Sequence, residues 1–502
     1  MSTATAAAGA DAPAAGTSYR TPGYRLYVLL VLTLVYTLNF IDRNLLNVIG
    51  QPIIKAFGLS DSEYGFLNGP PFALFYAVMG IPLAMAADRY NRIIVVALCI
   101  SVCSIMAALC GFAGSFLFLL FARVGVAIGE AGCTPPANSI IGDYFKPKSR
   151  ANALAIYAMG VTIGSALANY FGGPILGLNG MMIQNLFEGW GWDWAVQMTD
   201  WSKVEGWRIA FVMTGAPGVL VALLLLLTVK EPPRGFSDPP GTKRVERASM
   251  LETLREIGPK PTFWTMAIGA SLAALIGYGL TGFQAPMVQR VHGVGPGAFA
   301  WEFGGPLAIA AAAGTFAGGF LIDRWSTRFP KAVAIVPVIG FLLTPIFYIS
   351  AYYLPTEQLY SVARPLWLVG AFCAYLYLGS QYTIGQGVAS QRGRASAVAI
   401  LLLLIALIGN GLGPQIVGWM SDMFMGLELK NAGVGGVLTP DLCRNAAEAA
   451  KLPADQQAVC AAAYGNGLRS SMVATALIYV PAALFFFLSS LTLKKDMIAA
   501  TH

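Results

Sequence analysis

The sequence predicts an all-α integral membrane protein with twelve transmembrane helices in two pseudo-symmetric six-helix bundles. Three observations predict it: an apolar composition, long apolar runs without alternation, and landmarks that recur in the two halves of the chain. Of 502 residues, 56% are hydrophobic and only 11% are charged, whereas a typical soluble domain has roughly 25% charged residues. So few charges cannot cover a water-facing surface of this size, which excludes soluble enzymes, nucleic-acid-binding proteins and disordered scaffolds.

The apolar runs are continuous and show no alternation of polar and apolar residues. In lipid the backbone must satisfy its own hydrogen bonds, so apolar runs of about 20 residues predict helices rather than the strands of a barrel. Twelve segments qualify. They are 25–50, 62–87, 93–113, 115–141, 151–178, 207–229, 261–289, 300–322, 330–353, 363–389, 395–425 and 468–492.

These spans divide the chain into two bundles, 25–229 and 261–492, joined by a cytoplasmic linker over 230–260. We expect a disordered cytoplasmic tail over 1–24, an external loop over 426–467 within the second bundle, and a second cytoplasmic tail over 493–502. The N-terminal stretch lacks the basic residues that open a secretory signal, so the first span would also act as the insertion signal.

The linker contains a pattern typical of a short amphipathic helix. Ser249 and Glu252 match a capping box, and Leu254 and Ile257 follow on one face. Such a helix would lie on the cytoplasmic face, but a plain spacer explains the pattern equally well.

Lysine and arginine are unevenly divided between the two sides of the membrane. Twelve spans put both termini on one side, where the connecting segments hold 21 Lys and Arg, against nine on the opposite side. The positive-inside rule then places both termini in the cytoplasm. The net charge of +7 therefore reflects membrane topology, and a nucleic-acid partner is not expected.

Three landmarks recur at nearly one period, with shifts of 235, 244 and 240 residues. The matched pairs are Asp88-Arg89 with Asp323-Arg324, Arg150 with Arg394, and Pro174 with Pro414. Each pair lies in corresponding positions of the two halves, which predicts a duplicated six-span unit.

Six plus six spans, a basic central linker and Asp-Arg after spans 2 and 8 resemble the major facilitator superfamily. The inter-span signature of that family is Gly-x-x-x-Asp-Arg-x-Gly-Arg. Its first copy is degenerate here, since Ala84 and Asn91 replace the two glycines, while the second keeps Gly319, Asp323 and Arg324. The resemblance covers nearly the whole chain and implies the fold of that family.

Three segments are similar to the Spinster branch: Asn39–Arg43 in span 1, 123–131 in span 4, and 143–153 after it. Members of that branch are proton-linked or facilitative carriers of lysophospholipids and phosphorylated sphingoid bases. The resemblance, to bacterial Spinster homologues in particular, implies a lipid-like substrate and protons as the coupling ion, with no other cofactor. We expect a monomer in the lipid bilayer of the plasma (bacterial inner) membrane.

Four charged residues are predicted within spans: Asp42, Arg43, Arg123 and Glu130. Each costs about 2.5–3.5 kcal/mol near the bilayer centre, and pairing two acids with two bases offsets most of that cost. Arg123 and Glu130 are seven residues apart, so they share one face of a helix about 10.5 Å apart along its axis. Since spans 1 and 4 line the cavity of the implied fold, we expect Asp42 to contact Arg123, with Glu130 deeper.

The functional interpretation of these charges is a switch between substrate and proton. A carboxylate beside an arginine stays ionised. If an anionic headgroup takes the arginine, the carboxylate loses its partner and can bind a proton, which links the two ligands through one ion pair. The alternative is an inert pair that fixes the packing of span 1 against span 4.

The predicted C-terminal wall of the cavity is uncharged and aromatic. Its candidate residues in spans 7 and 10 are Tyr278, Phe283, Gln284, Tyr375, Tyr377, Gln381 and Tyr382. One charged and one aromatic wall suit an amphipathic solute with its headgroup at the first bundle and its chain at the second. Plain packing of the spans explains the same aromatics.

Other functions remain open from the sequence. A sugar-acid porter could use Arg43 and Arg123 to bind a carboxylate, and a membrane-embedded lipid-modifying enzyme or a non-transporting receptor are the alternatives from other classes. The chain has two histidines and lacks metalloprotease, esterase and P-loop motifs, so we expect no metal and no enzyme activity of those types.

Two further predictions concern the ends of the spans. The charges Asp88, Arg89, Arg92, Asp323 and Arg324 are expected to latch helix ends at an inner gate. Cys443 and Cys460 both lie in the predicted external loop, where an oxidising compartment favours a disulfide that staples the loop.

Overall fold

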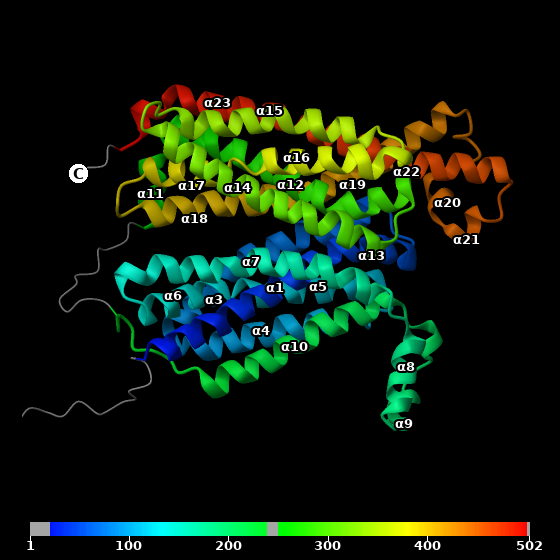
Figure 1. Ribbon diagram of the computed structural model, residues 1–502, viewed down its shortest axis with the longest axis horizontal. Coiled ribbons are helices and arrows are strands. Elements are labelled where there is room, and N and C mark those ends of the chain that lie inside the picture. The colour runs from blue at the N-terminus through cyan, green and yellow to red at the C-terminus, as the bar shows by residue number, and fades with distance from the viewer. Residues whose placement is uncertain (1–20, 238–248, 499–502) are drawn as a thin grey trace, which may run out of the picture.

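The computed structural model describes residues 21–237 and 249–498, and this part of the chain is helical without strands. Twelve of its helical segments are long and apolar enough to cross a membrane. They form two bundles that lie side by side (Figure 1). The predicted all-α fold with twelve spans in two bundles is therefore confirmed.

The first bundle begins at Pro22, three residues before the predicted span. Its spans are α1 (Pro22–Phe57), α2 (Asp61–Asn68) with α3 (Pro70–Arg89), α4 (Arg92–Cys110), α5 (Phe116–Ala131) with α6 (Thr134–Tyr144), α7 (Pro147–Leu176) and α10 (Gly206–Thr228). The predicted second span is divided at Gly69, because Pro70 and Pro71 lack the amide hydrogens that would continue the helix from α2.

The second bundle begins with α12 (Pro261–His292). Its other spans are α13 (Pro296–Phe299), η3 (Ala300–Gly304) and α14 (Gly305–Ser326); α15 (Ala332–Tyr352); α16 (Arg364–Ala374) with α17 (Leu378–Gly387); α18 (Arg394–Leu404), η6 (Ile405–Leu412) and α19 (Gly413–Asn431); and α22 (Ala454–Leu477) with α23 (Tyr479–Asp496). Short η4 (Thr356–Gln358) and η5 (Leu359–Ala363) precede α16.

The segment predicted as an external loop, 426–467, is largely helical. The helix α19 continues to Asn431, α22 already begins at Ala454, and α20 (Pro440–Arg444) and α21 (Ala446–Ala449) lie between them. The start of α22 is rich in Ala and Gln, which favour helix but are not apolar enough to mark a membrane span.

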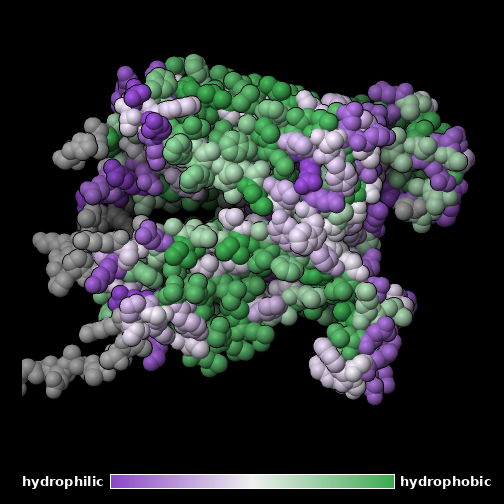
Figure 2. Space-filling view, viewed as in Figure 1, coloured by the Kyte–Doolittle hydropathy of each residue, from purple (hydrophilic) through white to green (hydrophobic). Residues whose placement is uncertain are grey.

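The two ends of the molecule differ in how the bundles meet. We call the end where α1 begins and α23 ends the terminal face, and the end that carries α8 (Gly180–Gly189), α9 (Asp193–Val196) and α20–α22 the loop face (Figure 1). At the loop face the bundles touch: the rings of Tyr170 and Trp301 lie 4.7 Å apart, and Tyr64 donates to the carbonyl oxygen of Gly282 at 3.2 Å. Toward the terminal face a hollow opens between the bundles (Figure 2).

The linker contains one described helix, α11 (Met250–Ile257). Its capping box forms between Ser249 and Glu252, and Thr253 and Ile257 are buried. The helix packs against α18, where Glu256 accepts hydrogen bonds from the backbone and side chain of Ser390. Residues 238–248 of the linker, 1–20 of the predicted N-terminal tail and 499–502 of the predicted C-terminal tail lie outside the described residues.

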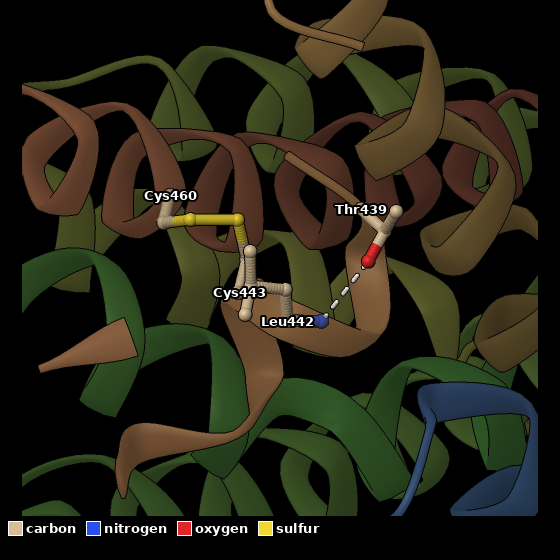
Figure 3. Close-up of a disulfide and its surroundings, with 4 residues drawn as sticks. All are labelled: Thr439, Leu442, Cys443 and Cys460. Atoms are coloured by element: carbon tan, nitrogen blue, oxygen red, sulfur yellow. Dashed lines mark hydrogen bonds between the residues drawn. A yellow bond between two sulfur atoms is a disulfide. The ribbon is translucent and has the colours of Figure 1, made fainter. Parts of the chain in front are cut away.

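A disulfide joins Cys443 of α20 to Cys460 of α22, across a sequence separation of 17 residues (Figure 3). The adjacent turn is capped by Thr439, whose hydroxyl accepts from the amide of Leu442 at 3.3 Å. The small apolar cluster around this bond includes Met425 and Leu438. The disulfide therefore fastens the segment between α19 and α22 to the body of the second bundle.

Replacing Cys443 by Ser should loosen this segment without changing the spans. Closing a loop of this size constrains the unfolded segment by about 3 kcal/mol in the chain-entropy treatment. We expect limited proteolysis to cleave 432–453 rapidly in Cys443→Ser and in reduced wild-type protein, but slowly in oxidised wild-type protein. Equal cleavage rates in all three samples would contradict a stapling role.

Candidate functional site

The charged residues of the first bundle form one buried cluster at the hollow. Arg43 of α1 donates through Nη2 to Oε1 of Glu130 of α5, at 2.5 Å. The Glu130 side chain is 3% exposed and that of Arg43 is 17% exposed. The arginine is therefore the accessible partner of the pair, and a solute in the hollow would reach it first.

The expected contact between Asp42 and Arg123 does not form. Arg123 acts on Asp42 electrostatically, but the two make no ion pair, and Asp42 Oδ1 and Arg123 Nε and Nη1 are buried without hydrogen-bond partners. The reason is the helical step of 100° between adjacent residues, which directs Arg43 toward the hollow and Asp42 into the packed side of α1. Glu130, predicted to lie deeper, is the residue that Arg43 reaches.

Aromatic rings surround the two guanidinium groups. Arg43 lies 5.0 Å from the ring centre of Phe72 and 5.3 Å from that of Tyr76, and Arg123 lies 5.3 Å from Phe72. Phe72 is thus shared by both arginines, and cation–π attraction offsets part of the cost of burying them. This arrangement holds two positive charges close together with only one ion-paired carboxylate between them.

Tyr278 of the second bundle corresponds in position to Arg43 of the first, and it is 39% exposed. Both α1 and α12 end at a left-handed glycine, Gly58 and Gly293, and each of the two residues precedes its glycine by 15 positions. Arg43 and Tyr278 therefore occupy equivalent positions of the duplicated unit.

A cavity of about 440 Å³ lies between the bundles, lined by α1 and α7 on one side and by η3, α12, α14, α15, α16 and α23 on the other. Its first wall is polar but uncharged, with Asn44, Asn47, Ser165 and Asn169. Its second wall is mainly apolar and aromatic. The residues of this wall include Leu280, Gln284, Phe299, Leu307, Ala308, Tyr348, Trp367, Tyr375 and Tyr479.

The structure divides the predicted C-terminal wall into cavity residues and core residues. Gln284 and Tyr375 line the cavity, and Tyr278 and Tyr382 are exposed. Three residues predicted to line the cavity, Phe283, Tyr377 and Gln381, are instead buried in the second bundle and do not line it. In a helix only one face meets the hollow, so a run of aromatic residues contributes to both the wall and the core.

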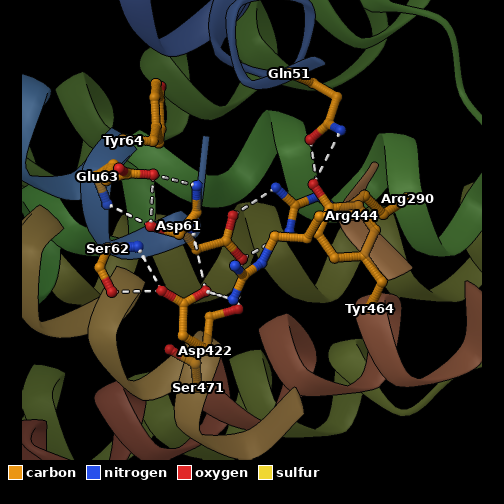
Figure 4. Close-up of polar contacts among 12 residues, drawn as sticks. Gln51, Asp61, Ser62, Glu63, Tyr64, Arg290, Asp422, Arg444, Tyr464 and Ser471 are labelled. Atoms are coloured by element: carbon orange, nitrogen blue, oxygen red, sulfur yellow. Dashed lines mark hydrogen bonds and ion pairs between the residues drawn. The ribbon is translucent and has the colours of Figure 1, made fainter. Parts of the chain in front are cut away.

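A second buried ion pair closes the loop face (Figure 4). Arg290 of α12 holds both carboxylate oxygens of Asp61 of α2, at 2.6 and 2.7 Å, and both side chains are 3% exposed. Arg290 also donates to Gln51 at 2.7 Å and lies 3.9 Å from the ring centre of Tyr464. Ser421 donates to Asp61 at 2.6 Å. This network joins the two bundles.

Asp422 of α19 extends the network from Asp61 to Ser62 and Arg444 (Figure 4). It accepts from the backbone amides of Asp61 and Ser62, at 3.1 and 2.9 Å, and from the hydroxyl of Ser62. Arg444 donates to it at 3.0 Å. Since Arg444 follows Cys443, the disulfide-bonded segment contributes directly to the closure of the loop face.

These loop-face residues were missed by the sequence analysis. Asp61 lies just outside the predicted second span. Arg290 is one of the nine basic residues that the sequence places on the side opposite the termini, and it was given no other role. A usable signal existed, because Asp61 and Asp422 are acids at the loop-face ends of spans from different bundles, where a basic partner is required once they are buried.

The expected inner-gate residues behave differently from one another. Asp88, Arg89, Asp323 and Arg324 are exposed at the terminal face. Arg92 is buried and binds Asp143 of the first bundle at 2.5 Å and Glu231 at the start of the linker at 2.6 Å. Within the described ranges none of the five forms an ion pair between the bundles, so the gate remains a prediction for a state closed at this face.

Among the residues that the structure describes, no group of three or more His, Cys, Asp or Glu is arranged to hold a metal ion. The cluster provides one accessible guanidinium, one buried carboxylate in an ion pair and one buried carboxylate outside it, with an amphipathic cavity beside them. This arrangement can exchange an ionic partner and a proton.

Comparison with known proteins gives consistent matches. Residues 32–414 match the Major Facilitator Superfamily. A crystal structure of a bacterial homolog to the human lysosomal transporter Spinster, in an inward-facing and unoccupied conformation, shares 51% identity, with a TM-score of 0.89 over 96% of this chain and 100% of that one. An MFS-type efflux pump of Mycolicibacterium smegmatis is 33% identical over 78% of this chain and 83% of its own length. Protein spinster homolog 1 of Xenopus tropicalis is 23% identical over 81% and 74%.

Breaking the loop-face pair should open that face. In Arg290→Met the buried carboxylate of Asp61 loses its partner, and breaking such a pair costs about 3–5 kcal/mol. We expect spin labels on Lys55→Cys and Lys430→Cys to show a new, longer distance population by pulsed EPR in nanodiscs.

Lys451→Met is the matched control, because it removes an exposed ion pair with Glu448 on the same face. It should leave the distances unchanged. Identical distributions in wild type, Arg290→Met and the control would refute a closing role for Asp61 and Arg290.

Proposed function

This chain belongs to the major facilitator superfamily and is a Spinster-type transporter, and from this premise we propose that it moves an amphipathic, anionic or zwitterionic lipid by proton-linked alternating access. The substrate class is lysophospholipids or phosphorylated sphingoid bases. The cytoplasm lies at the terminal face and the membrane is the bacterial inner membrane, so the hollow of this conformation opens inward. The relatives named above are transporters, and transport rather than catalysis is the activity of this family.

The ion pair between Arg43 and Glu130 carries the proposal. Its arginine is accessible from the hollow and its carboxylate is buried. A phosphate-bearing headgroup binds guanidinium in place of a carboxylate with similar geometry. Once the headgroup takes Arg43, Glu130 is left buried and unpaired, and it becomes neutral by binding a proton. Lipid and proton are then bound together.

The unpaired groups next to the pair support the same exchange. Asp42 and Arg123 are buried, and neither forms an ion pair with any residue that the structure describes. Two positive and two negative groups with only one ion pair among them leave the cluster able to rearrange when a ligand or proton arrives. A cluster whose only task is to fix packing would gain stability by pairing all four.

The shape of the cavity supports a lipid rather than a small sugar acid. Its second wall is lined by Leu307, Phe299, Trp367 and Tyr479, which suits an alkyl chain. Arg123 is 2% exposed, so it cannot share a small carboxylate with Arg43 from the hollow. A sugar-acid porter would need both arginines accessible.

Removing the exchangeable carboxylates should uncouple transport from the proton gradient. We expect lysolipid uptake by proteoliposomes to lose its dependence on an imposed pH gradient in Glu130→Gln and in Asp42→Asn, because an amide cannot bind and release the proton. Glu357→Gln, an exposed acid, should respond like wild type. Undiminished gradient dependence in both buried variants would show that protons are coupled elsewhere.

Substrate choice separates the lipid carrier from the sugar-acid porter. We expect flux of labelled lysophosphatidylcholine and no flux of labelled hexuronate. Arg43→Gln should reduce lysolipid transport by about ten- to a hundredfold, as one lost charge-assisted contact predicts, while Arg328→Gln, which removes an exposed basic residue, should change little. Hexuronate flux without lysolipid flux would make the sugar-acid porter the correct assignment.

A further inference from the structure

Several hydrogen-bond donors on the first wall of the cavity are used internally. Ser165 donates to the backbone of Val161 at 2.8 Å, Asn169 donates to the backbone of Ser165 at 2.8 Å, and Asn44 donates to the backbone of Phe40 and to Ser165. These bonds are made without a ligand.

Two buried donors on the second wall have no partner. The amide nitrogen Nε2 of Gln284 and the indole nitrogen Nε1 of Trp367 both lack an acceptor. Gln284 is 9% exposed and Trp367 is 1% exposed, and both line the cavity. Buried donors without partners are rare in proteins, so each needs an explanation.

The two donors belong to one neighbourhood, because Tyr352 contacts both residues. Its hydroxyl donates to Gln284 Oε1 at 3.1 Å, which fixes the amide so that Nε2 is the free end. The ring of Tyr352 lies 5.7 Å from that of Trp367. Gln284 and Trp367 therefore both contact Tyr352, and both residues line the same cavity.

The acceptor that satisfies these donors carries no full charge. No Lys or Arg lines the cavity, so a phosphate or carboxylate there would be buried without a cation, which is far costlier than burying a neutral group. A carbonyl oxygen has two lone pairs and accepts two N–H donors. The adjoining surface of Leu307, Ala308 and Ala311 suits an alkyl chain attached to that carbonyl.

We propose that this cavity recognises the carbonyl of an ester- or amide-linked acyl chain, with Gln284 and Trp367 as the donors that read it. The inference rests on the proposed function and narrows its substrate class. Lysophospholipids have such a carbonyl next to the chain, whereas phosphorylated sphingoid bases have none. The headgroup then lies toward Arg43, whose neighbours Asn44 and Asn47 begin the first wall of the cavity.

The test compares two lipids that differ only in this group: ester-linked lysophosphatidylcholine and the ether-linked lipid of equal chain length. In proteoliposomes of wild-type protein we expect the ether lipid to have a KM about ten- to a hundredfold higher, because it loses the hydrogen bonds to both buried donors. Trp367→Phe keeps an aromatic ring, although a smaller one, and removes the N–H, and Gln284→Leu removes the amide. Both should weaken the preference for the ester by raising its KM toward that of the ether lipid.

Gln415→Leu is the matched control, because it removes an amide of α19 outside the cavity lining, and it should keep the wild-type preference. Equal KM values for the two lipids in wild-type protein, or an unchanged preference in Trp367→Phe, would overturn the inference while the proposed lipid transport stands. Flux of neither lipid would instead remove the proposed function itself. Should Gln284→Leu fail to fold, Trp367→Phe decides alone.

Discussion

The constraint on which this molecule depends is that a charge buried in an apolar bundle needs an opposite charge beside it. Two of the ion pairs that meet it matter most for function, and they join different helices. Arg290 and Asp61 hold the two bundles together at the loop face with both partners buried. Arg43 and Glu130 hold α1 against α5 within the first bundle, with the arginine accessible from the hollow. A pair with both side chains buried resists replacement of either partner, whereas a pair with one accessible side chain can bind a ligand in place of its partner.

The two pairs have different roles in the proposed transport cycle: one closes the loop face, and the other binds the ligand. The loop-face network includes Arg444, which is attached to the disulfide-bonded segment, so closure of that face depends on parts of α2, α12, α19 and α20 at once. The pair at the hollow belongs to one bundle only, and ligand binding there changes local charge without first separating the bundles. In our proposal the headgroup and the proton neutralise the cluster together, and only a neutral cluster is inexpensive to enclose when the bundles close over it.

The fold was predictable because continuous apolar runs and a duplicated pattern leave few alternatives, and all twelve spans were found. The ends were less predictable: α22 begins with polar, Ala-rich turns that hydropathy does not detect. Charges within spans identified the cluster of Asp42, Arg43, Arg123 and Glu130, but not its pairing, since adjacent residues on a helix face different neighbours. Asp61 and Arg290 were missed because a charge at a span end is ordinary until the structure shows that it is buried.

The central claim is that lipid binding breaks the pair between Arg43 and Glu130 and leaves a carboxylate that takes a proton. The most direct measurement is the number of protons exchanged when lysophosphatidylcholine is added to purified protein in weakly buffered detergent solution. We predict net uptake approaching one proton for each lipid bound, and its loss in Glu130→Gln at retained lipid binding. Saturable binding with no proton uptake, or with proton release, would contradict the account.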